Sequence, residues 1–360
     1  MSSASGPPGQ QPQGGSWQQG PQPQYEGYTP PAPPQPPRSK KPWIIAAVAF
    51  GCVLVLLVVA GIGVGIWALS GDDEPDSGPS ATDTSDPEEG TATVSGPSED
   101  KPFKVIYPGD PPAGTAEEIR EILGSSPLTT GTYPTIGSCE LPKITKKATQ
   151  EELQAFLSAG NTCLSGALAT TMSDRNLSWT SPRVVVFTWP DIPADTPCEA
   201  NTFDQTFPRM CNLDNVLYWP MSTEGLATDA AEEDLASAYL VDLAYLLMQP
   251  LSWQTSLGLY NAQASDQYEE GSAEWKDQYR RFNLQGRCMS AALAMQLPDG
   301  AKPSKGTLAR MVDEKTWPPN EEPRDIPPRA MVQWIAAGRD SGGDLAACNT
   351  WTVSSGDISG

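Results

Sequence analysis

Carboxylates and thiols, rather than imidazoles, are the side chains of this chain that could do chemistry. Its 360 residues contain no histidine. Zinc hydrolases and serine or cysteine hydrolases depend on histidine as a metal ligand or as the base that activates the nucleophile. Active sites of these kinds are therefore excluded. A hydrolase that works with paired carboxylates remains an alternative, because the sequence does not show which carboxyl groups meet in space.

The acidic residues also narrow the choice of partners. The chain has 44 Asp and Glu residues against 23 Lys and Arg residues, which gives a formal net charge of -21 at pH 7. A charge of this sign disfavours binding to nucleic acids and to anionic membrane surfaces. We therefore expect no nucleic-acid partner, whereas a basic protein or peptide remains an allowed ligand.

The cysteines predict disulfide bonds rather than a metal site. No two of them form a CxxC pair, and a chain without histidine cannot complete a mixed zinc site. Cys52 lies in an apolar segment, and an even number follows in the C-terminal part, which is typical of a domain that is oxidised outside the cytoplasm. The sequence leaves other connectivities open, but we predict sequential pairing: Cys139 with Cys163, Cys198 with Cys211, and Cys288 with Cys348.

An uninterrupted apolar segment at residues 43–69 predicts a transmembrane helix. The segment has no charged residue and exceeds the roughly 20 helical residues that a bilayer core requires. A long polar region precedes it, so we expect an uncleaved anchor rather than a signal peptide. Basic residues precede the segment and acidic residues follow it: Arg38, Lys40 and Lys41, then Asp72, Asp73 and Glu74. This asymmetry predicts a plasma-membrane protein with a cytoplasmic N-terminus and an extracytoplasmic C-terminal domain.

Composition divides the chain into four parts. Residues 1–42 form a tail rich in Pro, Gln and Gly, which we expect to be disordered and cytoplasmic. The membrane helix at 43–69 is followed by an acidic linker rich in Ser, Pro and Gly at 70–130 and by an extracytoplasmic domain at 131–355. Gly61 and Gly65 form a GxxxG pair in the membrane helix, so a homodimer packed through that helix is an open alternative.

Residue patterns in the C-terminal part predict an α+β domain rich in helix. Thr149 and Glu152 match a capping box, after which apolar residues recur at helical spacing. Helices are predicted at residues 116–123, 149–172, 229–249, 273–297 and 329–340, the third of them stopping at Pro250. Whether the first of these helices packs on the domain or belongs to the linker is left open. Strands are predicted at 183–189 and 216–219, and we expect them to pair as a hairpin-like sheet.

Several features follow one another in an order that is shared with a known family. They are a first helix that contains Cys163, the strand RVVVF, a cysteine-closed loop before a strand ending in YW, a long helix ending at Gln249, the run RRFNLQGRC, and a terminal ACNTW. In this order and spacing, residues 149–352 resemble the neutral zinc metallopeptidase family of bacterial membrane-anchored proteins. The resemblance implies a zincin-like, helix-rich extracytoplasmic domain with a small β-sheet.

The same resemblance implies that the family's active site is lost. In that family the long helix carries HExxH, followed three residues later by Gln, and the later run reads approximately RRxELQADC. Every position of the three zinc ligands, the general base and a supporting Asp is changed, and the residues found there are Asp242, Leu246, Asn283, Leu243 and Arg287, in that order. Neighbouring positions still match: Gln249, Leu284, Gln285 and Cys288. The resemblance thus implies a vestigial site with no catalytic residue, no metal ligand and no cofactor.

Asp242 is the one carboxylate within the apolar run LASAYLVDLAYLLM, so it must find a partner, be protonated or reach water. We expect Arg287 to pair with Asp242, with Asn283 supplying hydrogen bonds one helical turn before Arg287. The alternative is that Asp242 faces solvent on a partly exposed helix.

The leading hypothesis is a non-catalytic, membrane-tethered binding or scaffold protein, a pseudoenzyme with a protein or peptide partner whose identity the sequence does not give. Two alternatives stay open. One is a hydrolase that uses carboxylates such as Asp242 instead of zinc. The other is an accessory subunit of a cell-envelope protein complex.

Overall fold

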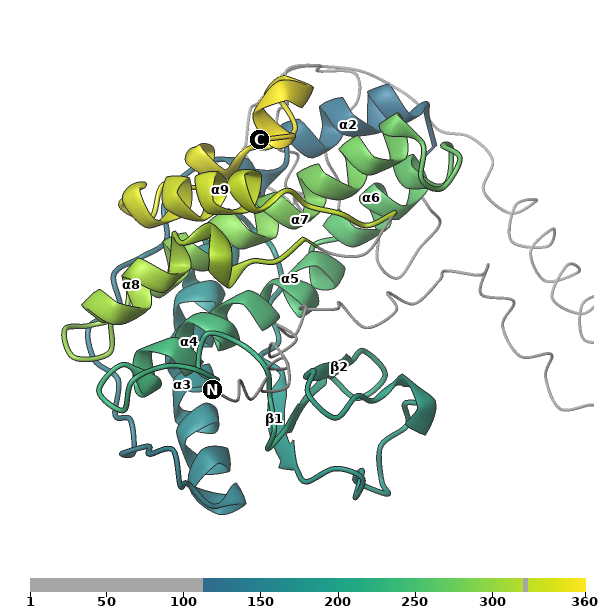
Figure 1. The fold of residues 1–360 in the computed structure, drawn as a ribbon. Helices are drawn as coiled ribbons and strands as arrows, with labels where there is room; N and C mark the ends of the chain where they lie inside the picture. The colour runs from purple at the N-terminus through teal and green to yellow at the C-terminus, as the bar shows by residue number, and fades with distance from the viewer. Residues whose placement is uncertain (1–112, 320–322) are drawn as a thin grey trace, which may run out of the picture. The chain divides into compact units, whose positions relative to one another are not determined.

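The computed structural model describes residues 113–319 and 323–360 as a helix-rich α+β structure with a small three-stranded sheet (Figure 1). The predicted tail, the predicted membrane helix with Cys52, Gly61 and Gly65, and most of the acidic linker lie outside these ranges. Within the described ranges, no helix has both the length and the apolar character that a membrane span requires. The many helices and the three-stranded sheet confirm the prediction of a helix-rich α+β fold.

Helices supply most of the described structure. In chain order they are α2 (Ala116–Gly124), α3 (Gln150–Ser173), α4 (Leu235–Leu246), α5 (Met248–Gln254), α6 (Leu257–Ser265), α7 (Ala273–Ala294), α8 (Lys305–Met311) and α9 (Pro328–Asp340). The strands are β1 (Arg183–Phe187), β2 (Arg209–Cys211) and β3 (Val216–Pro220). The helices predicted at 116–123, 149–172, 273–297 and 329–340 correspond to α2, α3, α7 and α9.

Helix α3 begins where its capping residues predict. The Thr149 hydroxyl accepts a hydrogen bond from the Glu152 backbone N–H at 3.2 Å, and the Glu152 carboxylate accepts one from the Thr149 backbone N–H at 2.8 Å. These two bonds satisfy donors that the first turn of a helix leaves without partners. One face of α3 then enters the core, where Phe156, Leu164 and Leu168 are fully buried.

The sheet differs from the predicted hairpin. Its strand order is β1-β3-β2, and the two predicted strands, β1 and β3, pair in parallel. The antiparallel partner of β3 is β2, a three-residue strand that ends at Cys211. Three residues are too few to show a period, so the sequence did not reveal β2. The hairpin prediction is therefore wrong. In the sequence, β2 lies between β1 and β3, and β3 runs beside β1 in the same direction.

Side chains of α3 cover the outer edge of β1. The Gln154 amide accepts a hydrogen bond from Val186 N at 2.7 Å and donates one to the Val184 carbonyl at 2.8 Å. Gln150 donates a further bond to the Val186 carbonyl at 2.9 Å. The two glutamines therefore take the hydrogen bonds that a neighbouring strand would make, so this edge is not open to another chain.

The helix predicted at 229–249 is wrong at both ends. It begins at Leu235, and Glu232, which was expected to help start it, instead accepts a hydrogen bond from Lys146 N at 3.4 Å. It stops at Leu246, and α5 then continues through Pro250. Proline has no N–H to donate to the Leu246 carbonyl, which explains the interruption. Within α5, however, Pro250 lies in the first turn, where a helix needs no such donor.

Helix α7 connects most of the helical part, because it contacts α4, α6 and α9 (Figure 1). The helices α7 and α9 approach closely at Gly338, where a Cβ would overlap the Cys288 carbonyl. Several hydrogen bonds fasten α7 to the segment after α9. The Thr350 hydroxyl donates to the Arg281 carbonyl at 2.8 Å, the Trp351 indole donates to the Gln285 amide oxygen at 2.9 Å, and the Arg281 guanidinium donates to carbonyl groups of this segment.

The domain begins before residue 131, the predicted boundary. Helix α2 packs on α6, and its residues Ile119 and Leu123 are completely buried. Arg120 of α2 forms an ion pair with Asp277 of α7 at 3.3 Å. The question that the sequence left open is thus answered, since α2 is part of the domain core rather than of the linker.

The cysteines pair sequentially, as predicted. The bonded pairs are Cys139–Cys163, Cys198–Cys211 and Cys288–Cys348, with Cα–Cα separations of 5.7, 6.0 and 5.3 Å. These separations lie in the range that disulfide geometry allows. Three disulfides in one domain are typical of an oxidising, extracytoplasmic compartment.

The contact at Gly338 predicts a large effect from one added methyl group. Gly338→Ala should lower the free energy of unfolding by about 1–3 kcal/mol, because α9 must move away from the Cys288 backbone. Gly166→Ala is the matched control on α3: it is exposed, a Cβ there meets nothing within 4 Å, and the substitution should stabilise by about 0.5–1 kcal/mol. Urea unfolding of both variants measures the two effects, and equal changes would contradict the proposed close contact.

Candidate functional site

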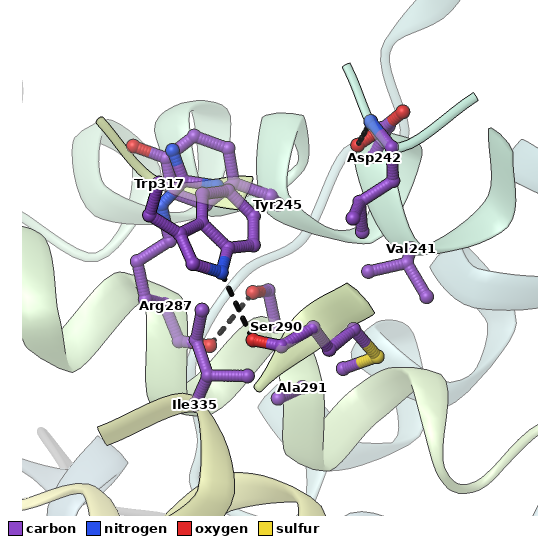
Figure 2. Close-up of a pocket in the computed structure, with 10 residues that line it drawn as sticks. Val241, Asp242, Tyr245, Arg287, Ser290, Ala291, Trp317 and Ile335 are labelled. Carbon is purple, nitrogen blue, oxygen red and sulfur yellow. Dashed lines mark hydrogen bonds between the residues drawn. The ribbon is translucent and has the colours of Figure 1, made fainter. Parts of the chain in front are cut away.

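Two of the five predicted site residues, Asp242 of α4 and Arg287 of α7, line one small cavity. Figure 2 shows Asp242 on one side of the site and Arg287 on the other, with Tyr245 and Trp317 beside the arginine. The cavity volume is about 10 Å³, roughly the room that one water molecule needs. Its wall is formed by Leu226, Val241, Asp242, Tyr245, Arg287, Ser290, Ala291, Met311, Trp317 and Ile335.

Asp242 is buried, with 6% of its surface exposed. Its two carboxylate oxygens accept hydrogen bonds from consecutive backbone N–H groups, Leu226 N at 3.2 Å and Ala227 N at 3.1 Å. The alternative that Asp242 faces solvent is therefore wrong. The carboxylate instead fastens the loop before α4 to the middle of that helix.

Burial has the largest effect on the pKa of the Asp242 carboxyl group. It raises the pKa of Asp242 from an ordinary 3.8 to about 7, against the lowering effects of the Leu226 and Ala227 amides and of the Arg287 and Arg310 charges. A carboxylate loses its hydration when it is buried, and two amide donors replace only part of it. Asp242 should therefore exchange a proton near neutral pH.

Arg287 does not form the direct ion pair that was predicted with Asp242. Its guanidinium carbon lies 3.4 Å from the centroid of the Tyr245 ring and 4.8 Å from that of Trp317. The reason for the difference is that Asp242 already accepts two backbone amides, while the guanidinium packs on aromatic rings, an arrangement that arginine favours. The positive charge of Arg287 still lowers the pKa of Asp242, so the two groups interact at a distance.

The other three predicted site residues do not line this cavity. Leu243 is completely buried and lies against Gly160 of α3. Leu246 is half-buried and packs against the core. The amide of Asn283 donates a hydrogen bond to the Tyr279 carbonyl of its own helix at 2.8 Å, whereas it was expected to bond to the Asp242–Arg287 pair.

Sequence reasoning missed the aromatic residues and the second arginine of the site. Tyr245 follows Asp242 by three residues on α4, so the helical period could have placed it on the same face. Trp317 comes from the segment after α8 and carried no such signal. Arg310 of α8 reaches the site by donating a hydrogen bond to the Leu226 carbonyl, a contact between residues 84 positions apart.

The charged groups that act on this cavity are the Asp242 carboxyl group and the guanidinium groups of Arg287 and Arg310. Within the described ranges, no group of three or more His, Cys, Asp or Glu side chains is placed so that it could hold a metal ion. No known protein-family model, curated protein or solved structure matches this chain. The family resemblance therefore stays a prediction. The site has to be judged on its own geometry.

The raised pKa of Asp242 predicts a pH-dependent stability. The protonated form is favoured in the folded state, so its contribution is fully present below the unfolded pKa of about 4 and is lost as the pH rises to about 7. We expect the unfolding midpoint of the wild type to fall relative to that of Asp242→Asn over this window, because the amide cannot ionise. Denaturant unfolding at several pH values measures the difference.

Asp299→Asn is the control for this experiment. The Asp299 side chain is fully exposed and forms a surface ion pair with Lys302 at 3.4 Å. Its variant should follow the wild type across the same pH range. If the difference in unfolding midpoint between the wild type and Asp242→Asn stays constant from pH 4 to pH 7, burial does not raise the pKa of Asp242 as described.

Proposed function

We propose that this chain is a non-catalytic, membrane-tethered binding or scaffold protein. Its extracytoplasmic domain would retain a metallopeptidase-like scaffold whose zinc site has been replaced, and its predicted segment at 43–69 would anchor it in the plasma membrane. The chain has no histidine, which supports the loss of histidine-dependent hydrolysis. The three disulfides support the extracytoplasmic placement.

The observation that carries this proposal is the filled site between α4 and α7. Asp242 is enclosed by its own backbone partners, and the cavity beside it has room for about one water molecule. Substrate pockets of enzymes are usually several hundred Å³ in volume. A scissile bond and an attacking water would not both fit next to Asp242 unless the surrounding side chains moved.

Several residues that match the resembled family hold the scaffold together. Gln285 binds the Trp351 indole, the Arg281 carbonyl binds Thr350, and Cys288 is bonded to Cys348. The positions that differ, such as Leu243, are those at which the resemblance would place chemistry. A sequence that keeps the contacts between α7 and the C-terminal segment while changing the chemical positions supports a domain retained for its shape.

A carboxylate-dependent hydrolase is the second candidate, because one observation favours it. The pKa of Asp242 is raised to about 7, and catalytic acids and bases are often tuned to this range. Burial among apolar neighbours also raises the pKa of purely structural carboxylates. The enclosed position of Asp242 therefore favours the structural role.

Metal content and turnover of the purified full chain test the proposal together. We expect substoichiometric zinc and no peptidase activity, with no change in either for Asp242→Asn. The exposed Asp299→Asn variant controls for effects of removing a negative charge. About one tightly bound metal ion per chain, or turnover that is lost with Asp242→Asn and kept with Asp299→Asn, would refute the non-catalytic function.

A further inference from the structure

The side chain of Arg287 is a buried cation, and its Nε atom has no hydrogen-bonding partner among the described residues. Arg287 has 7% of its surface exposed, and its Nε atom is buried with no acceptor. No carboxylate within the described ranges forms an ion pair with it. A buried charge without a counterion is costly, since it loses much of its hydration and gains no ion pair in exchange.

The neighbouring rings reduce this cost but do not remove it. Tyr245 and Trp317 lie against the guanidinium, and cation–π contacts of this kind stabilise by about 0.5–2 kcal/mol. The N–H donors of a guanidinium lie in its plane, however, and call for acceptors there. Arg287 lines the cavity, so an acceptor placed in that cavity would lie next to the guanidinium (Figure 2).

The charges around the cavity favour a negative ligand. Two arginines, Arg287 and Arg310, act on the site from α7 and α8, and Asp242 is the carboxylate that both of them influence. The Asp242 oxygens already accept the Leu226 and Ala227 amides. When Asp242 takes up a proton, the two cations have no anionic group within the cavity wall, since the other wall residues are neutral.

We propose that the cavity beside Arg287 binds one small monovalent anion, of the halide class, as the counterion of this arginine. The cavity volume of about 10 Å³ has room for about one particle of the size of water, which favours a small halide ion over the larger phosphate, sulfate and carboxylate ligands. A chloride ion would accept the N–H donors of Arg287 in place of the missing carboxylate. This inference does not depend on the proposed function, because it uses the charge and geometry of the described residues alone.

Thermal unfolding of the full chain tests the proposal when chloride replaces gluconate at constant ionic strength. Gluconate is too large for the cavity. At about pH 6, below the raised pKa of Asp242, and at chloride about fivefold above its dissociation constant, the wild type should unfold about 2–4 °C higher than in gluconate. Equal unfolding temperatures in gluconate and chloride would overturn the proposal.

Arg287→Met and Arg209→Met separate this site from other binding of chloride. Arg287→Met removes the cation and should abolish the chloride response. Arg209 is a half-buried arginine of β2 that forms no ion pair among the described residues and lies outside the cavity wall, so Arg209→Met should keep the response. A chloride response that persists in Arg287→Met, or that disappears in Arg209→Met, would refute the assignment to this cavity.

A diffraction experiment keeps the proposal testable if Arg287→Met does not fold. Crystals of the wild-type chain grown or soaked in bromide should show an anomalous peak inside the cavity, within about 3.5 Å of the guanidinium nitrogens. Density without anomalous signal would identify a water molecule, and an empty cavity would leave Arg287 without any ligand. Either of these two outcomes would overturn the proposal.

Discussion

The described domain depends on the close contact between α7 and α9 at Gly338. Because residue 338 has no side chain, the α9 backbone can lie against the Cys288 carbonyl, and the side chain of that same cysteine is bonded to Cys348. One residue of α7 therefore fixes two neighbouring segments, through its backbone and through its sulfur. Successive residues of a helix point about 100° apart, so this contact also fixes the direction of Arg287, the residue before Cys288, toward α4 and its Tyr245 ring.

The opposite wall of the cavity is held by buried polar contacts instead. Leu226 donates its N–H to Asp242 and accepts a hydrogen bond at its carbonyl from Arg310. The loop before α4 is thereby held from α4 on one side and from α8 on the other. Burying these charges costs solvation, and breaking one partner would leave the other uncompensated. The network therefore specifies the position of the loop more than it adds to stability.

Local patterns in the sequence predicted local structure, but they did not reveal contacts between residues far apart in the chain. The Thr149 capping box and the period of apolar residues placed α3. The even set of cysteines predicted disulfides, and the sequential pairing that we chose among the open connectivities is the one that the structure has. By contrast, β2 was too short to show a pattern, and Pro250 was taken as a helix end although a first turn tolerates proline.

The site was predictable in the same partial way. The sequence marked Asp242 as a carboxylate that needed a partner, but the partners it finds are backbone amides, which no side-chain pattern reveals. Arg287 was correctly placed near Asp242 but was paired with the wrong group, because the position of Trp317 depends on the packing of the segment after α8. Aromatic neighbours of a buried cation come from tertiary structure, and periodicity reports on only one element at a time.

The sign of the fixed charge connects the proposed loss of catalysis with the proposed anion site. A zinc hydrolase surrounds a bound cation with neutral or anionic ligands. Here a cation that belongs to the chain lies in the cavity wall, and Arg310 adds a second positive charge nearby. Their field would oppose a divalent metal and attract an anion. Because Asp242 has a pKa raised to about 7 despite both arginines, burial outweighs their attraction, which leaves the positive charge incompletely balanced. Arg287 would therefore act against metal binding and in favour of an anion.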